Sequence, residues 1–164
     1  MNPIDVIKGL EKQKKLSLIE KVLAVTTGSV TQTLEAYLEE PVGIRTLNQE
    51  VKEAGPFARD LGVGKKDEVN FREVEIINPR GKVLIIAKSW TPIKRLLPAF
   101  RDDLMKADVP IGKLLEKHHI EVRRELVKVW IENGNVRRTY NIISGGKILM
   151  RIEESLSGIS ALCP

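Results

Sequence analysis

The chain has 164 residues, of which 42% are hydrophobic and 30% are charged, and its formal net charge is +5. This composition is typical of a single globular domain spanning residues 1–164, and it argues against a disordered chain or a fibre. No apolar run approaches the length of a membrane-spanning helix and the N-terminus lacks the apolar core of a signal peptide, so we expect a cytoplasmic protein without a membrane partner.

The N-terminal part of the chain predicts two helices. Pro3 suits the first turn of a helix, and apolar residues then recur at roughly helical spacing, which predicts one N-terminal helix over residues 3–25. The sequence Ser29-x-x-Gln32 is a capping-box pattern, and it predicts a second helix over 30–39.

After Pro41 the pattern changes to strand, first over 42–51. Residues 69–77 and 82–90 then flank the turn sequence Asn78-Pro79-Arg80-Gly81, which predicts a hairpin. Two short helical segments are predicted between residues 91 and 119. The second begins after Asp108-Val109-Pro110 and covers 111–117.

The last third of the chain predicts three more strands, over 120–132, 136–144 and 147–155. Asn133-Gly134 and Gly145-Gly146 separate them, and both pairs favour tight hairpin turns that need positive φ angles. The whole order therefore predicts an α+β fold, a six-stranded antiparallel sheet with helices packed on it. The only cysteine is Cys163, so no disulfide is expected.

Two charged residues share a strand face with apolar side chains, because alternate residues of a strand point the same way. Arg72 shares its strand face with Val74 and Ile76, and Lys88 shares its strand face with Leu84. Such a charge can reach water at the end of a sheet or pair with a carboxylate. Alternatively, a guanidinium can wait in a cavity for the carboxylate of a ligand. Both interpretations stay open from the residues alone.

The common catalytic and binding motifs are missing from the sequence. There is no P-loop, GxGxxG, GxSxG or HExxH motif. His118 and His119 are adjacent and point to different sides, so we expect surface residues and no metal site. Basic residues are scattered among acids and aromatics are few, so no nucleic-acid partner is expected. The residues thus predict an α+β domain with a candidate anion pocket.

Four segments, in this order, resemble the chorismate pyruvate-lyase family, and its archaeal branch in particular. They are Thr27-Gly28-Ser29-Val30-Thr31 with Leu34-Glu35; Phe71-Arg72-Glu73-Val74 with Lys88-Ser89-Trp90-Thr91-Pro92; Val109-Pro110-Ile111-Gly112-Lys113-Leu114-Leu115; and Arg137-Arg138, Ser144-Gly145-Gly146-Lys147 and Ile152-Glu153. The resemblance implies helical flaps that cover a ligand cavity on the sheet. It also implies a reaction without a cofactor, in which chorismate gives 4-hydroxybenzoate and pyruvate.

The resemblance also implies roles for individual residues. Arg72 would bind the ring carboxylate, and Glu153 would bind the ring hydroxyl at the opposite end of the site and orient the substrate for loss of the ring hydrogen. The backbone N–H groups of Val30 and Ile111 would add hydrogen bonds at two helix starts.

The second carboxylate of chorismate needs another cation. Lys88 is the first candidate, although bacterial members of the family commonly have Arg there, and Arg138 is the second.

Two other functions remain open, and the oligomeric state is not predicted. The fold that the resemblance implies is also similar to that of effector-binding domains of some bacterial transcription regulators. A non-catalytic sensor of aromatic or carboxylate ligands is therefore the main alternative. Such domains follow a winged-helix domain, and only about 25 residues precede Gly28-Ser29. A general protein-interaction domain would instead expose an apolar face.

Overall fold

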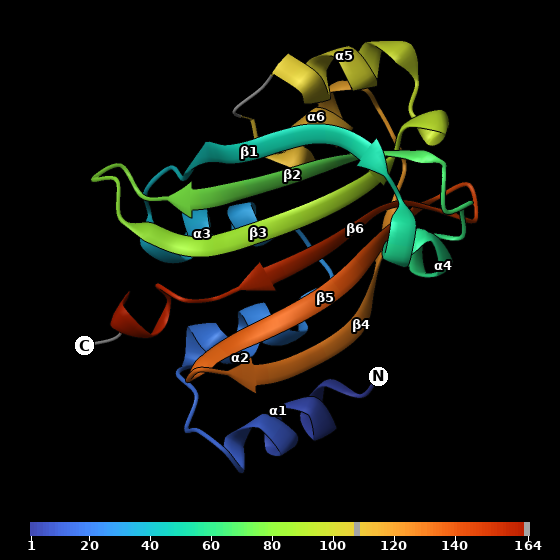
Figure 1. The fold of residues 1–164 in the computed structure, drawn as a ribbon. Coiled ribbons are helices and arrows are strands. Elements are labelled where there is room, and N and C mark those ends of the chain that lie inside the picture. The colour runs from blue at the N-terminus through green and yellow to red at the C-terminus, as the bar shows by residue number, and fades with distance from the viewer. Residues whose placement is uncertain (107–108, 163–164) are drawn as a thin grey trace.

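The computed structural model describes residues 1–106 and 109–162, and it confirms the α+β fold with a six-stranded antiparallel sheet (Figure 1). The strand order across the sheet is β1-β2-β3-β6-β5-β4. The strands are β1 Gly43–Glu53, β2 Glu68–Ile77, β3 Val83–Pro92, β4 Arg123–Glu132, β5 Asn135–Ser144 and β6 Lys147–Ser155. The helices are α1 Pro3–Glu11, α2 Leu18–Val25, α3 Val30–Leu38, α4 Ala58–Leu61, α5 Pro98–Lys106 and α6 Ile111–Lys117, with 3-10 turns η1 Gly55–Phe57, η2 Ile93–Arg95 and η3 Ser160–Leu162. Asp108 of the predicted helix start and Cys163 lie outside the described residues.

The predicted hairpin turns are confirmed by their backbone angles. Asn133 and Gly134 have φ values of 52° and 75°, and Gly145 and Gly146 have 55° and 75°. Two successive positive φ angles match the twist of the flanking strands, and they explain why the chain places Asn-Gly and Gly-Gly there. The two turns fix the register of β4, β5 and β6, on which the position of the site depends.

The single helix predicted over 3–25 is wrong, because α1 and α2 are separate. Ser17 begins α2 with a complete capping box: its Oγ accepts from the Glu20 N–H at 3.3 Å, and the Glu20 carboxylate accepts from the Ser17 N–H at 2.9 Å. A residue with this cap cannot also continue a helix from α1, since the capping residue has extended backbone angles.

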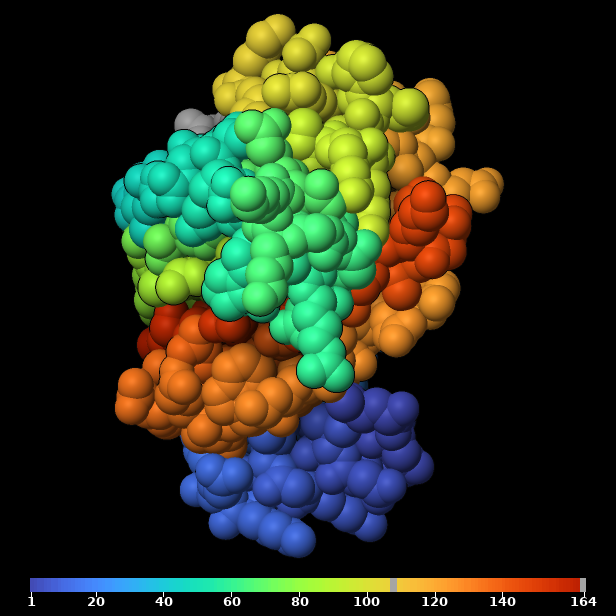
Figure 2. Space-filling view, turned by 45° about the vertical axis from the view of Figure 1, so that its right-hand side comes forward, coloured from blue at the N-terminus to red at the C-terminus, as the bar shows by residue number. Residues whose placement is uncertain are grey.

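Most of the helices cover one face of the sheet, which we call the inner face. In Figure 1, α2 and α3 lie behind the strands and α5 and α6 lie at the other end, above β1. Two apolar clusters fill the space under them. One joins α1, α2 and α3 to the sheet through residues such as Leu23, Leu34 and Val136, and the other joins α5 and α6 to it through Phe100, Leu114 and Ile142. Figure 2 shows the N-terminal helices as a lobe beside the β4–β5 hairpin, at the end of the molecule opposite α5.

The outer face of the sheet carries one short helical segment. Between β1 and β2, η1 and α4 form and cover one end of this face. Phe57 stacks on Trp90 with ring centroids 4.5 Å apart, and Phe71 packs against the same ring. Beyond this cluster the outer face carries charged pairs such as Lys88–Glu73. In the described part of the chain, no helix is both long and apolar enough to cross a membrane.

Both edge strands contain a β-bulge. The register of β1 against β2 shifts between Thr46 and Asn48, and the register of β4 against β5 shifts between Leu126 and Lys128. The extra residues, Leu47 and Val127, are 51% and 39% exposed. A bulge bends the strand and interrupts its row of backbone donors and acceptors.

Candidate functional site

A pocket lies on the inner face, where the two apolar clusters meet below the starts of α3 and α6. Most of its lining is apolar. Its polar or charged side chains come from both strands and helix starts, and they are Ser29, Thr31, Arg72, Ser89, Arg124, Tyr140 and Glu154. An apolar cavity with a few convergent polar groups is the usual form of a small-molecule site.

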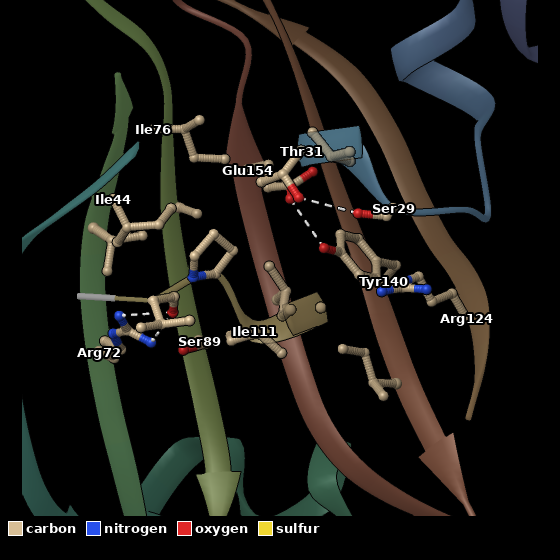
Figure 3. A pocket seen from close by; sticks show the side chains of 18 residues that line it. Ser29, Thr31, Ile44, Arg72, Ile76, Ser89, Ile111, Arg124, Tyr140 and Glu154 are labelled. Atoms are coloured by element: carbon tan, nitrogen blue, oxygen red, sulfur yellow. Dashed lines mark hydrogen bonds between the residues drawn. The ribbon is translucent and has the colours of Figure 1, made fainter. Parts of the chain in front are cut away.

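Strand register brings the polar groups of the pocket onto one face. Arg72 pairs with Ser89, Ser89 with Ile152, and Ile152 with Tyr140, so these side chains form one row across four strands. The neighbouring row runs from Val74 through Ala87 and Glu154 to Arg138. Arg72 and Glu154 therefore lie two strands and one row apart and face the same cavity (Figure 3).

Arg72 is buried, with 2% of its surface exposed. Both of its terminal nitrogens donate to the Val109 carbonyl, each at 3.4 Å, just before α6 begins. Hydrogen bonds of this length are weak, and a carboxylate would offer the guanidinium two charged acceptors in its own plane. The side chain is thus held at the pocket wall in a position to bind an anion.

Glu154 is the centre of a buried network at the other side of the pocket. One carboxylate oxygen accepts from Arg138 Nε at 2.7 Å and the other accepts from the Tyr140 hydroxyl at 2.9 Å. Burial alone would lower the pKa of Arg138, but the charge of Glu154, together with Tyr140 and the hydrogen bonds of both residues, outweighs this effect and holds that pKa above its ordinary value. Burial also raises the pKa of Tyr140 above its usual range, and the nearby Glu154 charge adds to the shift, so the phenol stays protonated and donates.

Arg138 connects this network to the N-terminal helices. Its Nη1 donates to the carbonyls of Leu23 and Thr26, at 2.7 and 2.9 Å, at the end of α2. A cation at a helix C-terminus satisfies carbonyls that the helix itself leaves free. This contact fixes the loop that leads into Ser29 and the pocket side of α3.

The two helices that begin at the pocket, α3 and α6, are joined by side chains. Ser29 caps α3 through the Gln32 N–H at 3.3 Å, as predicted, but the Gln32 side chain donates to Glu116 of α6 at 2.9 Å instead of closing the box. Lys113 and Glu35 form a second link at 3.8 Å. The first backbone N–H groups of each helix have no acceptor within the helix, and here they adjoin the cavity.

The structure brings three of the six predicted binding residues to the pocket: Val30, Arg72 and Ile111. It does not bring Lys88 and Glu153 there. They pair with each other across β3 and β6 on the outer face, where Lys88 also contacts Glu73 and Glu153 contacts Arg137. Arg138 is on the inner face, but its guanidinium is engaged by Glu154 and α2 behind the lining. The expectation that Arg72 and Glu153 face each other is therefore wrong, and Glu154 is the acid opposite Arg72.

The sequence contained the signal for Glu154. Counting by twos from Ile152, an apolar inner-face residue, leads to Glu154 and not to Glu153. Tyr140 could have been found in the same way from Arg138. Ser89 and Arg124 were not predicted, although their hairpin pairing with Arg72 and Ile142 places them on the face that lines the pocket.

The histidines differ from expectation in one respect. His118 is not a surface residue: it caps α6, its Nε2 lies 2.7 Å from Asp103 of α5, and its ring meets Phe100 edge-on. This contact holds the two helices together. Across residues 1–106 and 109–162, no three His, Cys, Asp or Glu side chains gather closely enough to hold a metal ion.

Comparison with known proteins supports the suspected family. The family model described as chorismate pyruvate-lyase Rv2949c-like matches residues 24–161. The chain is 34% identical to the provisionally named lyase MJ0807 of Methanocaldococcus jannaschii, over 90% of this chain and 83% of that protein. It is 26% identical to the chorismate pyruvate-lyase of Mycobacterium leprae, over 84% of this chain and 73% of that protein.

Solved structures share the fold at much lower identity. PhnF from Mycobacterium smegmatis matches with a TM-score of 0.64 and 12% identity over 80% of this chain, which spans 64% of PhnF. The separate effector domain of PhnF matches with a TM-score of 0.62 and 12% identity, over 80% of this chain and 89% of that domain. These likenesses concern the fold alone, whereas the sequence match covers most of the chain. The chain therefore belongs to the Rv2949c-like chorismate pyruvate-lyase family.

Proposed function

We propose that the chain eliminates pyruvate from chorismate and releases 4-hydroxybenzoate. The observation that carries the proposal is the arrangement of Arg72 and Glu154 across one apolar pocket. 4-Hydroxybenzoate has a carboxylate at one end of its ring and a hydroxyl at the other. An arginine and a hydrogen-bonded acid at two sides of an apolar cavity complement such a molecule.

In the proposed complex, Arg72 binds the ring carboxylate with two parallel hydrogen bonds. The backbone N–H groups of Val30 and Ile111 add donors from the helix starts. Glu154, held by Arg138 and Tyr140, accepts the hydrogen bond of the ring hydroxyl and takes the role that the family resemblance implies for Glu153.

The reaction requires correct positioning of the substrate more than strong acid–base groups. The proton on the hydroxyl-bearing ring carbon leaves, the bond from the neighbouring ring carbon to the enolpyruvyl oxygen breaks, and the released enolate takes up a proton to become pyruvate. The ring becomes aromatic, so the elimination is downhill and redox-neutral. Holding the ring in the reactive geometry then supplies much of the rate enhancement, and the Glu154 carboxylate lies beside the carbon that loses its proton.

The test is to mix the purified chain with chorismate and to measure both products. We expect pyruvate and 4-hydroxybenzoate in equal amounts. Arg72→Ala should lower kcat/KM by about 100-fold or more, because a bidentate charged contact is lost. Arg45→Ala is the matched control, since Arg45 is an exposed arginine paired with Glu75 on the neighbouring strand, and its activity should stay that of the parent chain.

A second candidate function is ligand binding without turnover. The fold likeness to the PhnF effector domain favours it. Binding of 4-hydroxybenzoate with no products from chorismate would support this candidate and contradict the lyase. A chain that neither binds 4-hydroxybenzoate nor produces it would contradict both.

A further inference from the structure

Chorismate carries a second carboxylate, which Arg72 cannot bind while it holds the first. This carboxylate belongs to the enolpyruvyl group, on the ring carbon next to the one with the hydroxyl. If the hydroxyl lies at Glu154 and Tyr140, the second carboxylate lies near that end of the pocket and away from Arg72. The inference below rests on the proposed function in this respect.

Arg124 supplies a positive charge in the required region. Among the described residues that line the pocket, Arg72 and Arg124 are the two with cationic side chains. Arg124 pairs with Ile142 in the β4–β5 ladder, which directs it to the inner face on the Tyr140 side. Its backbone lies four strand spacings from that of Arg72, or roughly 19 Å along the sheet at about 4.8 Å per strand. Figure 3 shows the two arginines at opposite sides of the cavity.

Arg124 lies where the pocket opens to the surface. Together with Ser29 and Gly112, it lines both the pocket and an outer groove between α3, α6 and the start of β4. A methyl group built on Gly112 would lie 3.4 Å from Ser29 Oγ and 3.8 Å from Arg124 Nη2. The start of α6 thus passes close to both side chains, and glycine there leaves the space between them open.

The side chain of Arg124 is not committed to a carboxylate of the protein. Within residues 1–106 and 109–162, no hydrogen bond or ion pair of its guanidinium is found. Glu116 and Glu121 line the same outer groove, but Glu116 accepts from Gln32. By contrast, the neighbouring Arg123 pairs with Glu125 at 2.7 Å on the exposed side of the strand.

We infer that Arg124 binds the enolpyruvyl carboxylate at the pocket mouth, and that this contact makes the site selective for a dianionic substrate over its monoanionic product. Lys88 and Arg138 cannot take this part, since one lies on the outer face and the other is engaged behind Glu154. After elimination the second carboxylate leaves with pyruvate, so the contact stabilises substrate and not 4-hydroxybenzoate.

The test compares substrate and product in an Arg124→Gln variant. Loss of one charged hydrogen-bonding contact predicts a fall in kcat/KM for chorismate of about 10- to 100-fold. The Kd of 4-hydroxybenzoate should change by less than about twofold, since it lacks the second carboxylate. Arg124→Lys keeps the charge and should recover part of the loss. Arg123→Gln removes an equal charge from the adjacent residue and should change neither quantity.

The outcomes separate this inference from the proposed function. Normal kcat/KM for chorismate in Arg124→Gln overturns the inference while the lyase stands. An equal loss of chorismate turnover and 4-hydroxybenzoate affinity also overturns it, because the residue would then support the pocket as a whole. A parent chain that produces no pyruvate contradicts the proposed function, and the inference with it.

Discussion

At the scale of single residues, Glu154 joins the pocket to the core. One of its oxygens accepts from a buried arginine and the other from a buried tyrosine, so the acid that we propose as a ligand contact is also part of the buried framework. Its neighbour Glu153 has an ordinary place on the outer face, with 29% of its side chain exposed and Arg137 beside it. Two adjacent glutamates therefore have very different environments.

This difference predicts different costs for the same substitution. Glu154→Gln leaves the buried Arg138 without its counter-charge and should lower the free energy of unfolding by about 3–5 kcal/mol. Glu153→Gln breaks a partly exposed pair and should cost less than about 1 kcal/mol. Denaturant unfolding of both variants measures the two values. Equal losses would show that the Arg138–Glu154 pair is not the buried one.

The same pair of residues shows what alternation along a strand can and cannot predict. The pattern of β2 correctly places Arg72 on the face of Val74 and Ile76, which lines the candidate pocket. The family motif points to Glu153, one residue before the acid that the period of two in β6 places on the pocket face. Lys88 was wrong for a different reason, since its face of β3 becomes the inner or the outer one only when the helices pack on the sheet.

At the scale of elements, short local signals were the most predictive. The two-glycine and Asn-Gly turns fix their own φ angles, so the hairpins could be predicted without tertiary contacts. The break between α1 and α2 also has a local signal, the capping box Ser17-x-x-Glu20, although the apolar period continues across it. The short helix α4 could not be foreseen, because four residues hold a helical shape only through packing on Phe71 and Trp90.

Gly158 offers a prediction at this scale. It follows β6 and donates its N–H to the Leu84 carbonyl at 2.9 Å, and a methyl group there would lie 2.0 Å from the Val83 oxygen. Gly158→Ala must push the chain away from β3 and should destabilise the fold by about 1–3 kcal/mol or more. Thermal unfolding measures the loss.

Gly9 provides the matched control for that substitution. It lies inside α1, and a methyl group there would meet nothing within 4 Å. Gly9→Ala should therefore stabilise the chain by about 0.5–1 kcal/mol through helix propensity alone. The same chemical change thus has opposite signs at the two sites, and a loss at Gly9 or a gain at Gly158 would contradict the packing described for them.

At the scale of the whole molecule, the pocket lies between two apolar clusters that pack different helices on one sheet. A ligand that touches both sides adds contacts present only in the folded state, so its binding raises the stability of the whole chain. The family resemblance predicted a ligand cavity under helices. Composition and periodicity alone predicted only that helices would cover the sheet.

This coupling predicts a thermal shift with product. At 4-hydroxybenzoate concentrations about 100 times Kd, the folded state gains about 2.7 kcal/mol. For a chain of this size that corresponds to a rise in Tm of roughly 5–10 °C. Arg72→Ala should lose the rise, and Lys88→Ala, on the outer face, should keep it. Scanning calorimetry measures the Tm. If Arg72→Ala showed the full rise in Tm with 4-hydroxybenzoate, Arg72 would not be part of the binding site.

The bulges at Leu47 and Val127 have a consequence for behaviour in concentrated solution. A flat edge strand is a template on which another chain can add, and open sheets of this kind risk growing into aggregates. Here each edge strand of the sheet has a bulge in its middle. A strand of another chain would therefore lose register with it before the two had paired along their full length. The bulges therefore make both edge strands poorer templates for the addition of another chain.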